Sequence, residues 1–324
     1  MSRNYDTSSH NVNTFPRLFR RHAAFRLLSI LILGMATSPA LVPTLACAAP
    51  IRSQPERVRS VRQGPMLMLR RTLEFLVKRR YEVKTIGLDE IRSQGNERIL
   101  FFSNHPSGSD TYLNELLLLE DFAPRPLMEE LYYNTPIIKQ LSDQVDALPV
   151  YRGHGPSIDR RTAMMKLKKM ITEVREGLQA RHNFLIYPAG ELQTSKLESL
   201  SNTGIVDRLL EGDDQTRVVL IRVRGLWGSL FSFARNGRHS PMPVNFLRAA
   251  QVLLQNGVFF APKRPVTLEY VEPKDFPRHG TRDEIKAYLE EFYNDEAPGN
   301  TYVPEGWWEG AEPEIRPEPT HTPA

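Results

Sequence analysis

The stretch 99–110 constrains the fold of this chain more than any other part of its sequence. It begins with the apolar run Ile99–Phe102, which has the length of a strand, and continues through a turn of small and polar residues. An apolar helix pattern follows from about Thr111. A strand that enters a helix through such a turn places side chains at the carboxyl edge of a sheet, where α/β folds carry their chemistry.

His105 and Asp110 stand at the two ends of this turn. A carboxylate that holds one imidazole nitrogen fixes the tautomer of the ring and leaves the other nitrogen free to act as a base. Asp110 also lies near the N-terminus of the expected helix, where an ionised carboxylate is favoured. The two residues are therefore our candidate catalytic pair.

The spacing alone is not specific, because the chain contains a second His-x-x-x-x-Asp pattern at His154 and Asp159. His154 lies between two glycines, and two arginines follow Asp159 and are more natural partners for it than an imidazole. We expect His154 to be a solvated loop residue, with a substrate contact as the alternative, and we expect only His105 to be catalytic.

Asn104, His105 and Asp110 after an apolar strand resemble the first motif of the glycerolipid (phospholipid/glycerol) acyltransferases. In that family the histidine is a general base and the aspartate is its partner. The resemblance implies a lysophospholipid acyltransferase-like enzyme. Such an enzyme moves a fatty acyl group from an acyl thioester, acyl-CoA or acyl carrier protein, to a hydroxyl of an acceptor such as 1-acylglycerol-3-phosphate. The acyl donor is then a co-substrate, and no cofactor, metal or covalent acyl-enzyme is implied.

The stretch 147–152 predicts a short strand that ends in a basic residue, Arg152, as the second motif of the family does. An arginine is a natural partner for a phosphate, because its guanidinium donates two hydrogen bonds at once. The resemblance therefore implies that Arg152 binds the acceptor. A solvated arginine at a strand end is the alternative.

A further predicted strand and turn, 183–191, resembles the third motif, whose usual form is Phe-Pro-Glu-Gly-Thr-Arg-Ser. Tyr187 and Gly190 fit this form, whereas Ala189 replaces its glutamate and Glu191 comes two places later. The family uses this motif to bind the acceptor headgroup. The resemblance therefore implies substrate-binding roles for Gly190 and Glu191, and the departures suggest an unusual acceptor.

The stretch 217–225 resembles the fourth motif, with Leu220 in place of the usual proline. The four motifs follow the family's order within residues 83–270, and this order is more specific than any single motif. Two further stretches, 226–232 and 300–304, are similar to the acyltransferase halves of bacterial lysophospholipid acyltransferase–ligase fusions.

Two other function classes stay open. A lipid esterase or hydrolase at the same site would need a nucleophile, and the chain has no G-x-S-x-G elbow. A catalytically weak lipid-binding protein would explain the altered third and fourth motifs. Nucleic-acid binding is disfavoured, because the sequence has no helix-turn-helix, zinc-finger or RNA-binding signature.

The N-terminal part of the chain is basic. Residues 1–51 contain five arginines and one aspartate, and residues 52–80 contain nine basic and two acidic residues. This excess suits an anionic membrane surface. The apolar stripe of the expected helix 65–80 favours an interfacial helix or, alternatively, a surface helix packed on the core.

No charge falls between Arg26 and Arg52, and the stretch between them is long enough to span a bilayer. It also resembles a signal peptide that ends in the cleavage pattern Ala46-Cys47-Ala48. Both interpretations stay open. Cys47 is the only cysteine, so the fold has no intrachain disulfide and no Cys-based metal site.

We expect a single α/β domain with a mixed, largely parallel sheet flanked by helices, and N-terminal helices that associate with the membrane. The expected parts are a disordered N-terminus with the signal-like or transmembrane segment, 1–51, a basic amphipathic helical region, 52–82, the acyltransferase domain, 83–296, and a Pro/Glu-rich tail, 297–324, disordered after Trp308. Within the domain, 124–142 is expected to be irregular and then helical. The catalytic body is expected on the cytoplasmic face of a bacterial inner membrane, because both acyl donors are cytoplasmic.

Overall fold

The computed structural model of the chain divides into two units, 1–50 and 51–324. The described residues all belong to the second unit: 53–61, 64–133, 139, 142–143, 145–150, 160–200, 205–310 and 312–319. The stretch between Arg26 and Arg52, Arg152 itself and His154 lie outside the described residues. What we expect of them stays a prediction.

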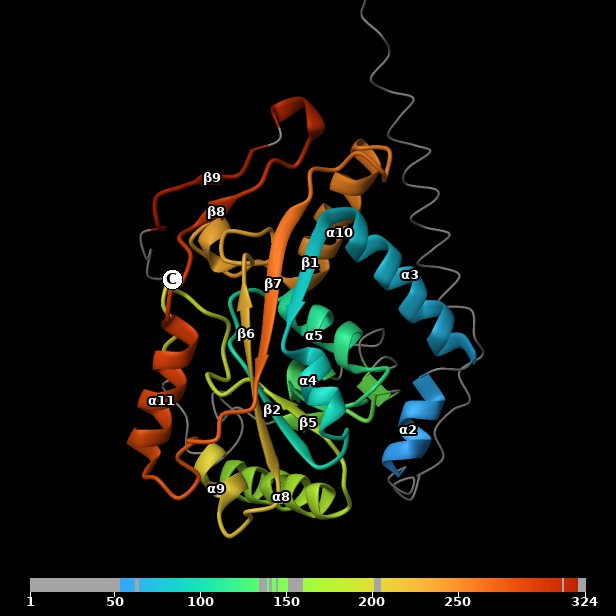
Figure 1. Cartoon of the computed structure of the whole chain (residues 1–324). Coiled ribbons are helices and arrows are strands. Elements are labelled where there is room, and N and C mark those ends of the chain that lie inside the picture. The colour runs from blue at the N-terminus through green and yellow to red at the C-terminus, as the bar shows by residue number, and fades with distance from the viewer. Residues whose placement is uncertain are drawn as a thin grey trace, which may run out of the picture. The chain divides into compact units, whose positions relative to one another are not determined.

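A seven-stranded sheet runs through the second unit (Figure 1). Its strands lie in the order β1-β7-β6-β2-β5-β3-β4, and their bounds are β1 Tyr81–Ile86, β2 Ile99–Ser103, β3 Arg125–Glu129, β4 Leu148–Val150, β5 Phe184–Ile186, β6 Arg217–Arg224 and β7 Arg264–Val271. Neighbouring strands are parallel except β6 and β7, which are antiparallel. An α/β domain with a mixed, largely parallel sheet is therefore confirmed.

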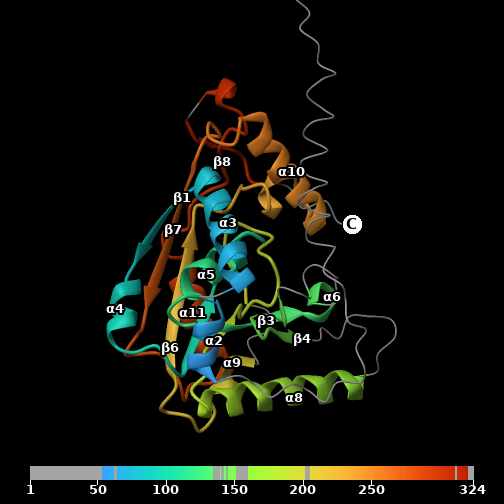
Figure 2. The same ribbon diagram turned by 90° about the vertical axis from the view of Figure 1, so that its right-hand side faces the viewer.

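Helices flank this sheet, with α8 at one end and α10 at the other (Figure 1; Figure 2). The helices are α2 Gln54–Val61, α3 Gly64–Arg80, α4 Leu88–Ser93, α5 Asp110–Leu118, α6 Glu130–Tyr133, α8 Arg160–Gln179, α9 Val206–Leu210, α10 Met242–Gln255 and α11 Arg282–Asn294. Two 3-10 turns, η2 Phe233–Arg235 and η3 Trp307–Glu309, and a two-stranded sheet of β8 Thr301–Tyr302 and β9 Glu314–Ile315 complete the unit.

Strand β2 fixes the position of the candidate site. All five of its residues are buried, as expected for a central parallel strand that is covered on both faces. Its side chains alternate between these faces. Phe101 belongs to the apolar cluster that contains Leu113 of α5, and Phe102 belongs to the cluster that contains Leu289 of α11. Helices on both faces thus hold the strand whose carboxyl end leads into His105.

Strand β3 contradicts the irregular structure that was expected at the start of 124–142. The helix expected after it, around 136–141, lies outside the described residues except for residue 139 and stays a prediction. Charged residues stand at both ends of the strand, and Pro126 interrupts its pattern. Its hydrogen-bonding partners are β5 on one side and β4 on the other, both distant in sequence. Pairing within the sheet, which local propensity does not report, therefore forms this strand.

The tail also differs from its expectation, because residues 312–319 are ordered into a strand and its flanks. Strand β9 pairs antiparallel with β8. Beyond it, the carboxylate of Glu318 accepts hydrogen bonds from Trp227 Nε1, at 2.8 Å, and from the main-chain N–H of Asn300, at 3.0 Å. The Pro/Glu-rich composition of the tail predicted disorder, because composition contains no information on specific hydrogen-bond partners such as these.

Helix α2 is fastened to the domain by Arg57, whose side chain is buried. Its guanidinium donates to the main-chain oxygens of Ala123, Pro124 and Val145 and pairs with Asp146. A buried cation needs such partners, because a buried charge without them would destabilise the protein by roughly several kcal/mol. In the described part of the chain, no helix combines the length and the apolar character that crossing a membrane requires.

Candidate active site

The turn between β2 and α5 brings His105 and Asp110 into contact. His105 Nδ1 lies 2.9 Å from Asp110 Oδ1 and 3.0 Å from Oδ2. The carboxylate is fully buried, and the imidazole is 16% exposed. Since Nδ1 faces Asp110, the ring leaves Nε2 as the nitrogen that can take a proton from a substrate.

Asp110 is held in turn by its surroundings. The main-chain N–H of Ser107 donates to Oδ2 at 3.2 Å, and the hydroxyl of Thr111 donates to Oδ1 at 3.3 Å. Asp110 is also the first residue of α5, where the helix dipole favours a negative charge. These contacts stabilise an ionised carboxylate that orients the imidazole.

Small residues let other segments pack closely against the turn. The main-chain N–H of Gly108 donates to the oxygen of Phe231 at 3.2 Å, and a Cβ atom at Gly108 would lie 3.1 Å from Met242 Sδ. The hydroxyl of Ser107 forms hydrogen bonds with those of Ser109, at 3.0 Å, and Ser229, at 2.9 Å. The loop 226–232, which the sequence singled out, therefore supports the turn.

Tyr187, from the stretch that resembles the third motif, stacks on the His105 imidazole. The ring centroids are 4.2 Å apart, with an angle of 28° between the planes. The Tyr187 hydroxyl accepts a hydrogen bond from Asn114 Nδ2 at 3.1 Å. Burial, together with the charge of Asp110, raises the pKa of this hydroxyl well above its usual value. Tyr187 therefore stays neutral and covers one face of the His105 ring.

Gly190 and Glu191 follow on the exposed side of the same turn. Gly190 has a φ of 67°, a left-handed conformation that favours glycine, and its N–H donates to the Tyr187 oxygen at 2.8 Å. Partial burial and the charge of His105 lower the pKa of His239, and the charge of Glu191 opposes them. Glu191 and His239 are therefore electrostatic neighbours beside the base. Arg152, the remaining predicted substrate-binding residue, lies outside the described part of the chain.

Two residues near the base were not found from the sequence. His239 carries no motif, and only its place in the fold brings it close to His105. Glu198 accepts a hydrogen bond from the main-chain N–H of His105 at 3.1 Å. Neither residue occurs at a spacing from His105 that a local pattern would reveal, because both reach it through folding.

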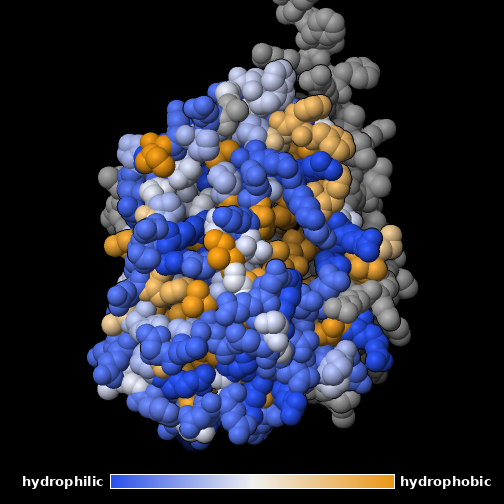
Figure 3. Space-filling model, viewed as in Figure 1, coloured by the Kyte–Doolittle hydropathy of each residue, from blue (hydrophilic) through white to orange (hydrophobic). Residues whose placement is uncertain are grey.

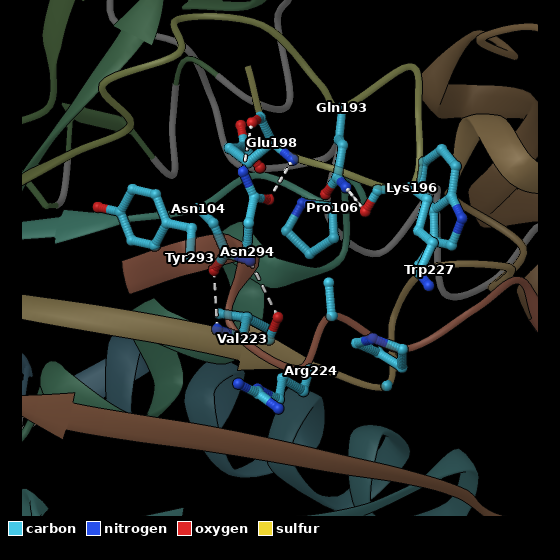
Figure 4. Close-up of a pocket in the computed structure, with 13 residues that line it drawn as sticks. Asn104, Pro106, Gln193, Lys196, Glu198, Val223, Arg224, Trp227, Tyr293 and Asn294 are labelled. Atoms are coloured by element: carbon cyan, nitrogen blue, oxygen red, sulfur yellow. Dashed lines mark hydrogen bonds between the residues drawn. The ribbon is translucent and has the colours of Figure 1, made fainter. Parts of the chain in front are cut away.

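A small polar pocket lies behind the main chain of the turn (Figure 4). It has a volume of about 20 Å³ and is lined by residues that include Asn104, Gln193, Glu198 and Asn294. A space of this size holds about one water molecule and no part of a lipid chain. This pocket is therefore too small to hold a lipid substrate.

Comparisons with known proteins do not establish what this site does. No protein-family model matches the chain, and no curated protein matches its sequence. Among solved structures, the chain is similar to the 1-acyl-sn-glycerophosphate (LPA) acyltransferase PlsC from Thermotoga maritima, at 17% identity and a TM-score of 0.42. The similarity covers 74% of this chain and 84% of that chain. Neither value is high enough to carry a function from that enzyme to this chain.

Proposed function

We propose that this chain is an acyltransferase that moves a fatty acyl group from an acyl thioester to a hydroxyl of a lysophospholipid-like acceptor. One observation carries the proposal. Asp110, fully buried at the start of α5, holds His105 Nδ1, and this pair stands at the carboxyl end of a central parallel strand. The order of the four motifs, on which the family resemblance rests, supports the same reaction.

In the proposed reaction, His105 Nε2 takes the proton of the acceptor hydroxyl as the hydroxyl oxygen attacks the thioester carbonyl carbon. The tetrahedral intermediate then collapses, the C–S bond breaks, and an ester C–O bond remains. The imidazolium gives its proton to the leaving thiolate, which restores neutral His105. Asp110 stabilises the transient positive charge without taking up the proton itself. These steps use no metal and no acyl-enzyme.

We propose further that Arg152, Gly190 and Glu191 bind the acceptor headgroup, with Arg152 on a phosphate. Arg152→Ala would then raise the acceptor KM with little change in kcat, because binding common to ground state and transition state is lost. A fall in kcat at unchanged KM would contradict this role.

We propose that the acceptor is a membrane lipid and that the domain works on the cytoplasmic face of a bacterial inner membrane. Contact with a membrane is supported by an exposed aromatic cluster, on a molecule whose surface carries several hydrophobic areas (Figure 3). Phe259 and Phe260 are 59% and 71% exposed, and Phe75 of α3 meets the Phe259 ring at 6.3 Å. The guanidinium of Arg79 lies over the rings of Phe75 and Phe259, at 4.4 and 4.7 Å. Aromatic rings with cationic neighbours are typical of surfaces that lie at lipid headgroups.

The decisive test is incubation of the full chain with labelled acyl-CoA or acyl carrier protein and a panel of lyso-lipids in detergent. Transfer of label to a lipid supports the proposal. Release of free fatty acid in place of transfer would make the protein a hydrolase. Lipid binding with neither product would leave it a binding protein.

A further inference from the structure

The segment after the third motif holds the main chain of His105 on both sides. The N–H of Gln193 donates to the His105 oxygen at 2.8 Å, and the His105 N–H donates to Glu198 Oε2 at 3.1 Å. Only four residues, 194–197, thus separate the two residues that hold His105. A side-chain carboxylate provides one of these two bonds, and a main-chain N–H provides the other.

Glu198 is itself anchored to α11 (Figure 4). Its N–H donates to Asn294 Oδ1 at 2.7 Å, and Asn294 Nδ2 donates to the Glu198 oxygen at 2.9 Å. Glu290 accepts from the N–H of Leu200 at 2.7 Å. Since α11 is packed into the core, for example through the fully buried Leu289, these bonds connect the base to a rigid element.

The Glu198 carboxylate lies in a crowded and buried place. The residue is 3% exposed. His105 and Asp110 face it from the turn, Glu290 and Tyr293 from α11, and Lys196 and Arg224 line the same small pocket. Burial raises the pKa of Glu198 to about 7, the charges of Asp110 and Glu290 act in the same direction, and His105 opposes them.

We propose that Glu198 is a positioning residue whose carboxylate holds the His105 main chain when ionised and loosens it when protonated, which makes the aim of the base depend on pH. A charged acceptor binds an N–H about twice as strongly as a neutral one. The ionised form therefore aligns Nε2 best. As the pH falls through about 7, Glu198 takes up a proton and the hold weakens.

The first test needs no substrate and so does not depend on the proposed function. The chain, labelled with 15N-histidine, has eight histidine amides, and His105→Gln identifies the one of interest. We expect the His105 amide signal to move upfield, with a midpoint near pH 7, as Glu198 becomes protonated. Glu198→Gln removes this midpoint. An amide signal without an inflection between pH 5.5 and 8.5 overturns the proposal.

The second test uses acyl transfer and rests on the proposed function. At pH 8.5 we expect Glu198→Gln to lower kcat about tenfold with acceptor KM unchanged, since a neutral amide replaces a charged acceptor. Toward pH 5.5 the two rates converge, because wild-type Glu198 is then protonated too. A ratio that stays constant with pH overturns the proposal, since a purely structural role would give that result.

Glu284→Gln is the matched control. Glu284 also accepts a main-chain N–H, that of Thr281 at 2.6 Å, but it lies at the far end of α11 from Asn294. It should change neither the amide titration nor the rate ratio.

The two tests separate the role of Glu198 from the proposed function. If the His105 amide signal titrates but the protein transfers no acyl group to any acceptor, the role of Glu198 is kept and the proposed function is rejected. If the protein transfers acyl groups but its His105 amide signal does not titrate, the proposed function is kept and the role of Glu198 is rejected.

Discussion

His105 is held on three sides. Asp110 binds Nδ1, the Tyr187 ring stacks on the imidazole, and Gln193 and Glu198 hold the main chain. A base fixed in this way loses little further freedom when a hydroxyl binds, and such orientation is a large part of what a protein adds to general-base catalysis. The orientation of His105 thus depends on residues from three separate segments of the chain.

Glu115 of α5 is a buried carboxyl group, and the effect of its burial on the free energy of unfolding can be tested. Both of its side-chain oxygens are buried and have no hydrogen-bond partner among the described residues, and burial raises its pKa from 4.5 to about 8. Between these values, the unfolded chain loses a proton that the folded chain keeps. The free energy of unfolding therefore falls as the pH rises from about 4.5 to about 8.

Glu115→Gln removes this titration. We expect the variant to gain stability relative to wild type as the pH rises from 5 to 8, by an amount on the order of a few kcal/mol. Urea unfolding at both pH values measures the difference. Glu90→Gln, an exposed change on α4, should show no such trend. An equal difference at pH 5 and pH 8 would mean that Glu115 does not keep its proton in the folded state.

Among the elements, the loop after β6 contains glycines that no other residue can easily replace, and Gly228 is one of them. Gly228 has a φ of 89°, and a Cβ atom there would lie 2.3 Å from the main-chain oxygen of Thr301 in β8. Gly228→Ala should therefore destabilise the protein by about 2–5 kcal/mol, from backbone strain and overpacking together. The shift of the urea midpoint measures this cost.

Gly212→Ala separates the two causes. Gly212 has a φ of 69° and no atom within 4 Å of the added Cβ, so only backbone strain remains. We expect it to cost about 1 kcal/mol. Equal losses of stability in the two variants would show that contact with β8 adds no destabilisation at Gly228.

Elements with strong local patterns were predicted well from the sequence. Strand Ile99–Ser103 and helix Asp110–Leu118 appear where the apolar run 99–102 and the apolar helix pattern from about Thr111 indicate them. Strand Arg125–Glu129 was missed because long-range pairing creates it. The tail strand Glu314–Ile315 was missed for the same reason.

The contacts of the candidate site also divide into one between residues that are close in sequence and one between residues that are distant. His105 and Asp110 lie five residues apart, so their contact follows from one local turn, and the sequence predicts it. Glu198 reaches the base over a separation of 93 residues, and its bond depends on the packing of α11. No local pattern carries such information.

At the scale of the whole molecule, the aromatic cluster near α10 and the apolar residues of α8 lie at opposite ends of the domain (Figure 1). Replacing Phe259 and Phe260 together by aspartate should weaken co-sedimentation with anionic phospholipid vesicles at least about tenfold, since two exposed rings and their favourable charge environment are lost. Vesicle binding that is unchanged would place the membrane contact elsewhere.

The matched control for this surface is on α8. Met164 and Met165 are 52% and 57% exposed, similar to Phe259, but they belong to α8, which lies at the other end of the domain from α10 (Figure 1). Their replacement by aspartate should leave vesicle binding within about twofold of wild type. Loss of binding in both variants would indicate general adsorption of apolar side chains.

The most direct measurement compares transfer of a labelled acyl group from thioester to lyso-lipid by wild type, His105→Ala and His154→Ala, with circular dichroism to check the fold. Removal of a positioned general base costs on the order of 100- to 10,000-fold in rate. We predict a loss in that range for His105→Ala and a rate within about tenfold of wild type for His154→Ala. A folded His105→Ala that retains the wild-type rate, or the reverse ranking of the two variants, would contradict the assignment of the base.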